Sequence, residues 1–219
     1  AVLVDVNAWG AMAAAEAADV PWGAWCPYPL PVPSRDAPPF GPGLPPAAGP
    51  LGRLRDRVLR PVVLGSLERI VIPPVNQLRT SLGLAPVADA HGLYTMAPLT
   101  LSLTAEPFEY PRSDWPPSIR MVGPCAWDPP ADVPDWLDAL DGDVVLVTTS
   151  SEFQDDGRLA AVAMEALADE DVTVVVTVPA GAPEAFDVPA NARVVAFVPH
   201  GPVLDRAVCA VTHGGMGAT

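Results

Sequence analysis

Short apolar runs alternate with stretches of helical periodicity along the start of the chain. The run AVLVD at residues 1–5 predicts a buried strand, residues 8–18 predict a helix, and residues 22–25 predict a second short strand. Asp19 and Pro21 are suited to end the helix. A strand, a helix and a strand in this order predict a βαβ unit, and therefore a parallel sheet.

This alternation stops after the second strand. Residues 27–50 are so rich in proline that no helix or strand is expected, and a loop of this length within a compact domain is typically a lid, a binding loop or a linker. Residues 51–82 carry leucine and valine at helical spacing. They predict helices that are broken at Pro61 and at Pro73-Pro74, because proline removes a helical hydrogen bond.

The second half of the chain returns to regular alternation. Strands are expected at residues 99–103 and 119–122, and the acidic, proline-rich residues 123–142 predict a linker that ends in a short helix. Beyond the linker, the order strand, helix, strand, strand, helix, strand is typical of an open, doubly wound sheet. The predicted fold class is α/β with two Rossmann-like domains, at residues 1–122 and 143–219. The chain starts inside a strand and stops where a helix opens, so we expect an internal piece of a longer protein with both domains incomplete.

Composition and charge narrow the function classes. Half of the 219 residues are hydrophobic, which allows a substantial core, and the formal net charge is −14. All twelve basic residues are arginine, so the sequence argues against a nucleic-acid partner. No apolar run reaches the roughly 20 residues that span a bilayer, so we expect no membrane association. Three scattered cysteines predict buried thiols in a reducing cytoplasm.

Polar residues follow three of the strands expected in the second domain, where parallel sheets bind their ligands. The first group, Thr148 to Ser151, offers hydroxyl groups to phosphate oxygens, or else forms a turn that caps the next helix. The second group lies in FVPHGPVL. There Pro199 holds the backbone open toward a base edge while Phe197 or His200 offers a ring face, or else the segment is an ordinary strand-to-helix turn.

The third group is the ending VTHGGMGAT. Gly214 and Gly215 let a ligand approach the backbone closely, the following helix would aim its free N–H groups at an anion, and His213 can donate a hydrogen bond to a phosphate. A dinucleotide fingerprint is the alternative, although that motif follows the first strand of its domain and this strand is the last.

One carboxylate of the first domain is a candidate for catalysis. Asp5 ends its strand just before a helix, where a carboxylate can orient a histidine and stabilise its charged form. The spacing alone favours a helix cap or an Asx-turn. His91 lies in a polar segment and is expected to be a solvated loop residue.

The segment FVPHGPVLDRAVCAVTHGGMGAT resembles the donor-binding signature of nucleotide-sugar-dependent glycosyltransferases with the GT-B architecture of two facing Rossmann-like domains. The segments VDVNAWGAMAAAEAADVPW, NQLRTSLGLAP and MVGPCAW resemble other parts of the same family. The resemblance is greatest to the actinobacterial enzymes that attach deoxysugars to macrolides, other polyketides and further natural products.

The resemblance implies a role for each matching residue. Residues 1–122 would be the C-terminal part of the acceptor-binding domain, 123–142 the linker, and 143–219 the N-terminal part of the donor-binding domain. Asp5 would orient a catalytic histidine that lies outside this chain. The residues implied in donor binding are Ser150, Ser151, Phe197, Val198, Pro199, His200, His213, Gly214, Gly215, Gly217 and Ala218.

The resemblance also implies a reaction. An inverting transfer would move a deoxysugar from a nucleoside diphosphate, with dTDP favoured over UDP, to a hydroxyl of a bulky apolar aglycone. No cofactor and no metal would be required, this chain alone would be inactive, and a homodimer stays open. The alternatives are a nucleotide-sugar epimerase of the same architecture, a non-catalytic helper protein, and a dinucleotide oxidoreductase.

Overall fold

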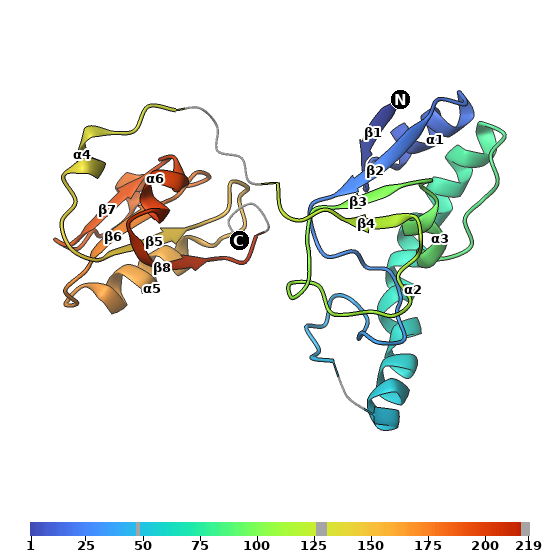
Figure 1. The fold of residues 1–219 in the computed structure, drawn as a ribbon, viewed down its shortest axis with the longest axis horizontal. Coiled ribbons are helices and arrows are strands. Elements are labelled where there is room, and N and C mark those ends of the chain that lie inside the picture. The colour runs from blue at the N-terminus through green and yellow to red at the C-terminus, as the bar shows by residue number, and fades with distance from the viewer. Residues whose placement is uncertain (47–48, 126–130, 216–219) are drawn as a thin grey trace. The chain divides into compact units, whose positions relative to one another are not determined.

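The structure is a computed structural model that describes residues 1–46, 49–125 and 131–215. It divides into two compact units, Ala1–Cys125 and Ala126–Thr219 (Figure 1). Each unit contains its own four-stranded sheet, and all strand pairs within the two sheets are parallel. The predicted α/β class with two Rossmann-like sheets is confirmed.

The first unit is built on a sheet in the order β1-β2-β3-β4. Its strands and first helix are β1 (Val2–Asp5), α1 (Trp9–Ala17), β2 (Trp22–Cys26), β3 (Thr100–Ser102) and β4 (Ile119–Met121). All five elements were expected within two residues of these bounds. They enclose a core that includes Val4, Met12, Ala24 and Ile119.

The helix that follows the proline-rich segment corrects the sequence prediction. One continuous helix, α2 (Gly49–Ser81), runs through Pro61 and Pro73-Pro74, where breaks were expected. A proline inside a helix costs about 3 kcal/mol, so packing along the rest of the helix must offset this cost. The Arg79 guanidinium contributes to this packing, because Arg79 forms a two-pronged ion pair with Glu16 of α1 at 2.8 and 3.0 Å.

A short helix that the sequence did not predict comes next, α3 (Ala90–Thr95). The Asp89 carboxylate caps it by accepting a hydrogen bond from the Gly92 N–H at 2.8 Å. His91 is exposed as expected, but it lies in this helix instead of a loop.

The second unit contains the sheet β7-β6-β5-β8. The elements are α4 (Asp135–Asp138), β5 (Val144–Thr148), α5 (Gly157–Leu167), β6 (Thr173–Thr177), a 3-10 turn (Pro183–Ala185), β7 (Ala192–Val195), α6 (His200–Leu204) and β8 (Ala207–Thr212). The predicted order of strands and helices is confirmed. Six of the ten residues in strands β5 and β6 are valine, and all but Thr173 are buried, as expected for parallel strands covered on both faces.

The cysteines depart from the expectation of buried thiols. Cys26 is buried at the end of β2, whereas Cys125 and Cys209 are exposed. Burial raises the pKa of the Cys26 thiol from 9.0 to about 11, and the thiol donates to the Tyr28 carbonyl. None of the helices in the described ranges combines the length and apolar character needed to cross a membrane.

Candidate functional site

The second sheet has one position where its strand order reverses. From β5 the chain proceeds outward through β6 to β7, and it then returns to add β8 on the other side of β5. Thr148 at the end of β5 pairs with Thr212 at the end of β8, so the loops after these two strands start side by side. Ligands of open α/β sheets bind in the crevice that such a reversal leaves at the carboxyl edge. Two of the three predicted polar groups therefore flank this crevice.

The loop after β5 uses most of its hydroxyl groups internally. Thr149 donates to the Thr177 carbonyl at 3.2 Å, and the Ser150 hydroxyl accepts a hydrogen bond from the Glu152 N–H at 3.1 Å. Ser150 is buried, whereas Ser151 is exposed. The group does not cap α5 as the alternative proposed, since the cap residue of that helix is Asp156. Ser151 is therefore the freer of the two serines to meet a ligand.

The loop after β8 brings the histidine and both glycines together. The His213 ring is half-buried, and its Nδ1 is buried with no hydrogen-bond partner among the described residues. Gly214 has φ +79°, a left-handed conformation that favours glycine, and its N–H donates to the Thr212 hydroxyl at 3.0 Å. A Cβ on Gly215 would lie 2.2 Å from His213 Nε2, so only glycine leaves room for the ring.

A buried nitrogen without a partner is costly unless a ligand or water completes it. Among the described side chains that flank the crevice, His213 therefore carries the structural indication of a polar ligand. Gly217 and Ala218 lie outside the described residues, as does the helix expected to follow them.

The turn between β7 and α6 presents the remaining predicted residues. Phe197 is about half exposed, whereas the Val198 side chain lies in the core and leaves only its backbone for a ligand. Pro199 is buried and is the cap residue that directly precedes α6. The His200 Nε2 lies 3.2 Å from the Thr177 hydroxyl at the end of β6. This contact fixes the ring, and Thr177 was not predicted, although a threonine near the end of the apolar run VTVVVTV was a visible signal.

In the first unit, Asp5 lies at the carboxyl end of β1 as expected. One carboxylate oxygen, Oδ1, accepts a hydrogen bond from the Asn7 N–H at 2.9 Å, which is the Asx-turn that the spacing favoured. The Asn7 side-chain oxygen in turn accepts from the Tyr28 hydroxyl at 2.8 Å. Asp5 does not cap α1, whose cap residue is Ala8. Its catalytic role stays a prediction.

Across the described ranges, histidine, cysteine and carboxylate side chains form no group of three or more that could hold a metal ion. The expectation of metal-independent chemistry stays a prediction.

Comparison with known proteins shows what the chain is similar to. No protein-family model matches it. The chain is 40% identical over 191 residues to 4'-demethylrebeccamycin synthase from Lentzea aerocolonigenes, a match that covers 84% of this chain and 45% of that protein. It is 34% identical over 210 residues to UDP-glycosyltransferase 2 from Phaeomoniella chlamydospora, with 86% and 45% covered. The chain thus spans less than half the length of these curated relatives.

A solved structure agrees with these relatives. The glycosyltransferase VinC in complex with DTDP matches with a TM-score of 0.61 at 24% identity, over 99% of this chain and 49% of VinC. This likeness shows a shared fold. By sequence and by fold, the chain is therefore homologous to natural-product glycosyltransferases of the GT-B architecture, as its sequence motifs indicated.

Proposed function

We propose that the whole protein is an inverting glycosyltransferase that moves a deoxysugar from a dTDP-linked donor to a hydroxyl of a bulky apolar natural product. UDP-glycosyltransferase 2, a relative named as a glycosyltransferase, supports the reaction class, and VinC in complex with DTDP supports the donor type. The observation that carries the proposal is the buried, unpartnered Nδ1 of His213 beside two glycines at the strand-order reversal.

The donor diphosphate would lie against the loop after β8. The His213 ring and the backbone of Gly214 and Gly215 would bind its oxygens and stabilise the charge that develops as the diphosphate leaves. The acceptor hydroxyl oxygen would attack the anomeric carbon from the opposite side, so the new glycosidic bond forms as the bond to the diphosphate breaks and the configuration inverts. A base removes the hydroxyl proton during this step.

Asp5 would act on that base. A histidine that takes the hydroxyl proton becomes positively charged, and a carboxylate beside it stabilises the charge and fixes the ring tautomer. We expect Asp5→Asn to lower kcat by a factor on the order of 10² to 10⁴. The affinity for dTDP should not change, because Asp5 belongs to the unit that does not carry the donor loops.

The donor site is tested by calorimetric titration of the full-length protein with dTDP and with UDP. We expect saturable binding that His213→Ala weakens by at least about tenfold, as expected for loss of a hydrogen bond to a charged group. His91→Ala is the matched control, because His91 is exposed on a short helix of the other unit. No binding of either nucleotide by a folded protein, or equal losses in both variants, would contradict the proposal.

A further inference from the structure

The segment that follows β2 has a sequence that prevents it from joining the sheet. It reads PLPVPS at residues 29–34, so three of its six residues have no backbone N–H. Its intervening side chains are nevertheless in the core, with Leu30 and Val32 both at most 5% exposed. Backbone groups that are carried into the interior in this way need hydrogen-bond partners, and a β-ladder cannot supply them.

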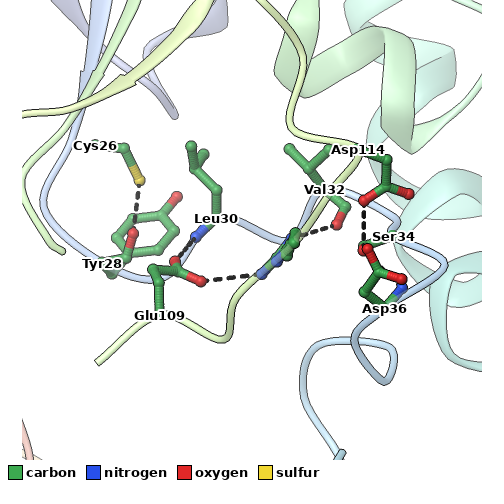
Figure 2. Close-up of polar contacts among 9 residues, drawn as sticks. Cys26, Tyr28, Leu30, Val32, Ser34, Asp36, Glu109 and Asp114 are labelled. Atoms are coloured by element: carbon green, nitrogen blue, oxygen red, sulfur yellow. Dashed lines mark hydrogen bonds and ion pairs between the residues drawn. The ribbon is translucent and has the colours of Figure 1, made fainter. Parts of the chain in front are cut away.

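Two charged side chains supply these partners. The Leu30 N–H donates to Glu109 Oε1 at 3.2 Å, and the Val32 carbonyl accepts from Arg112 Nη1 at 2.8 Å. Glu109 and Arg112 also bind each other, with 3.0 Å between Oε2 and Nη2. Figure 2 shows Glu109 reaching the backbone of Leu30, with the neighbouring contact to Val32 further along the same segment. We call this pair, Glu109 and Arg112, the clamp.

A second set of contacts continues the attachment toward the surface. The Ser34 hydroxyl donates to Asp114 Oδ1 at 2.7 Å, and the Arg35 N–H donates to Asp114 Oδ2 at 2.8 Å. The Asp36 carboxylate accepts from both the N–H and the hydroxyl of Ser113, at 2.7 and 2.6 Å. These hydrogen bonds lower the pKa of Asp36 below its ordinary value. Five of the seven residues at 30–36 are thus attached to residues 109–114 by hydrogen bonds in which at least one partner is a side chain.

The clamp is buried and depends on the shape of arginine. The side chains of Glu109 and Arg112 are 2% and 8% exposed. The guanidinium reaches two acceptors at once and also lies 4.2 Å over the Trp115 ring. A lysine at this position would present a single ammonium on a flexible stem, which cannot reproduce the fork.

The clamped segment lies close to Asp5. It starts just after Cys26, the last residue of β2, and β2 pairs with β1 so that Trp25 lies opposite Asp5. Tyr28 links the two structures, because its hydroxyl donates to Asn7, whose N–H donates to Asp5. Residues 28–36 therefore extend from the Asp5 turn to the clamp.

We propose that Glu109 and Arg112 are positioning residues that hold residues 28–36 as a fixed wall of the acceptor subsite beside Asp5. The inference rests on the proposed function, because it assigns the acceptor to this edge of the first unit. The wall would present the half-buried rings of Tyr28, Pro29 and Pro33 to an apolar acceptor, while the clamp itself stays beneath it. Loss of the clamp should loosen the wall and weaken acceptor binding without touching the donor site.

The test compares Arg112→Lys with Arg79→Lys in the full-length protein. Arg79 is the matched control, because it is also buried, pairs with a glutamate, Glu16, and donates to a backbone carbonyl, that of Ala85. The probe is 4-methylumbelliferone, an apolar phenol whose fluorescence reports both its binding and its glycosylation. Hydrogen exchange of the peptide that covers residues 28–36 reports the wall directly.

We expect Arg112→Lys to speed exchange in residues 28–36 and to raise both Kd and KM for the probe, each by about tenfold, the effect of losing one charged hydrogen bond. The kcat and the KM for the sugar donor should stay near the wild-type values. The two variants should lower Tm by comparable amounts. Arg79→Lys should nevertheless leave both the exchange in residues 28–36 and the probe affinity unchanged. Unchanged exchange in Arg112→Lys, faster exchange with unchanged probe affinity, or equal effects of the two variants would each overturn the inference.

The wild-type protein separates this inference from the proposed function. A protein that binds the probe but transfers no sugar from a dTDP-linked deoxysugar such as dTDP-rhamnose counts against the proposed function alone, because probe binding and exchange still decide the role of the clamp. A wild-type protein that does not bind the probe overturns the assignment of the wall to an acceptor subsite.

Discussion

Replacing Gly215 by alanine tests the role of His213 in the donor site, because the alanine Cβ would occupy a known position beside the His213 ring. The added Cβ would lie 2.2 Å from Nε2, 2.9 Å from Cε1 and 3.1 Å from Cδ2 of His213. Since non-bonded heavy atoms pack best at about 3.5–4.0 Å, the imidazole has to move by more than about 1 Å. The clash falls on the end of a side chain, so the ring can turn away while the backbone of the loop stays in place.

The expected loss can be derived from the interaction that the ring is proposed to make. A hydrogen bond to a charged group contributes about 1.5–3 kcal/mol, which corresponds to roughly 10- to 150-fold in Kd. Gly215→Ala should therefore weaken dTDP binding by about as much as His213→Ala, with little change in Tm. In a His213→Ala background the ring is gone, so Gly215→Ala should have no further effect, and this non-additivity identifies the ring as the cause.

The control is the neighbouring glycine. At Gly214 a Cβ would meet nothing within 4 Å, but φ is +79°, so Gly214→Ala should lower stability by about 1–2 kcal/mol without a clash. Calorimetric titration and thermal unfolding of the wild type and these four variants supply both readouts. The reasoning is refuted if Gly215→Ala binds dTDP as tightly as the wild type, or if it weakens binding equally with and without His213.

Two further predictions concern buried groups of the first unit. In the native protein we expect the exposed thiols of Cys125 and Cys209 to react rapidly with Ellman's reagent at pH 8. Cys26 should react only after unfolding, because it is buried and its pKa is raised to about 11. Three fast thiols in the native state would contradict this. Burial raises the pKa of Glu109 above its ordinary value of 4.5 despite the opposing charge of Arg112, so its contribution to stability is complete at low pH and is lost as the pH rises through the folded-state pKa. The free energy of unfolding of Glu109→Gln minus that of the wild type should therefore increase from pH 4 to pH 8, as measured by urea unfolding. A decrease over this range would show that the ion pair with Arg112 stabilises the ionised form of Glu109.

The order of strands was predictable because apolar runs directly report the buried strands. Residues Val144–Thr148, a short run of mostly valine that ends in threonine, are typical of a strand covered on both faces. Their position before an amphipathic helix predicted the parallel sheet. Helix α2 was less predictable, since its continuity through Pro61 and Pro73-Pro74 depends on contacts such as the Arg79–Glu16 pair that join residues 63 positions apart. Local propensity cannot report such packing.

The two candidate sites also differ in how far apart their residues lie in the sequence, and therefore in how well the sequence predicts them. His213 and its two glycines were visible as a short motif at a strand end, and the structure adds the reason why Gly215 is required. The clamp was invisible, because Glu109 and Arg112 act on Leu30 and Val32 about 80 residues away. The unusual alternation of prolines around Leu30 was the only local sign that this segment needs partners from elsewhere.

A crystal structure of the full-length protein with bound dTDP would test the central claim most directly. The account predicts that the diphosphate lies between the loops that follow β5 and β8, within hydrogen-bond distance of the His213 ring and of the Gly214 or Gly215 N–H. Nucleotide bound at any other strand end, with the His213 ring turned away from it, would contradict the account.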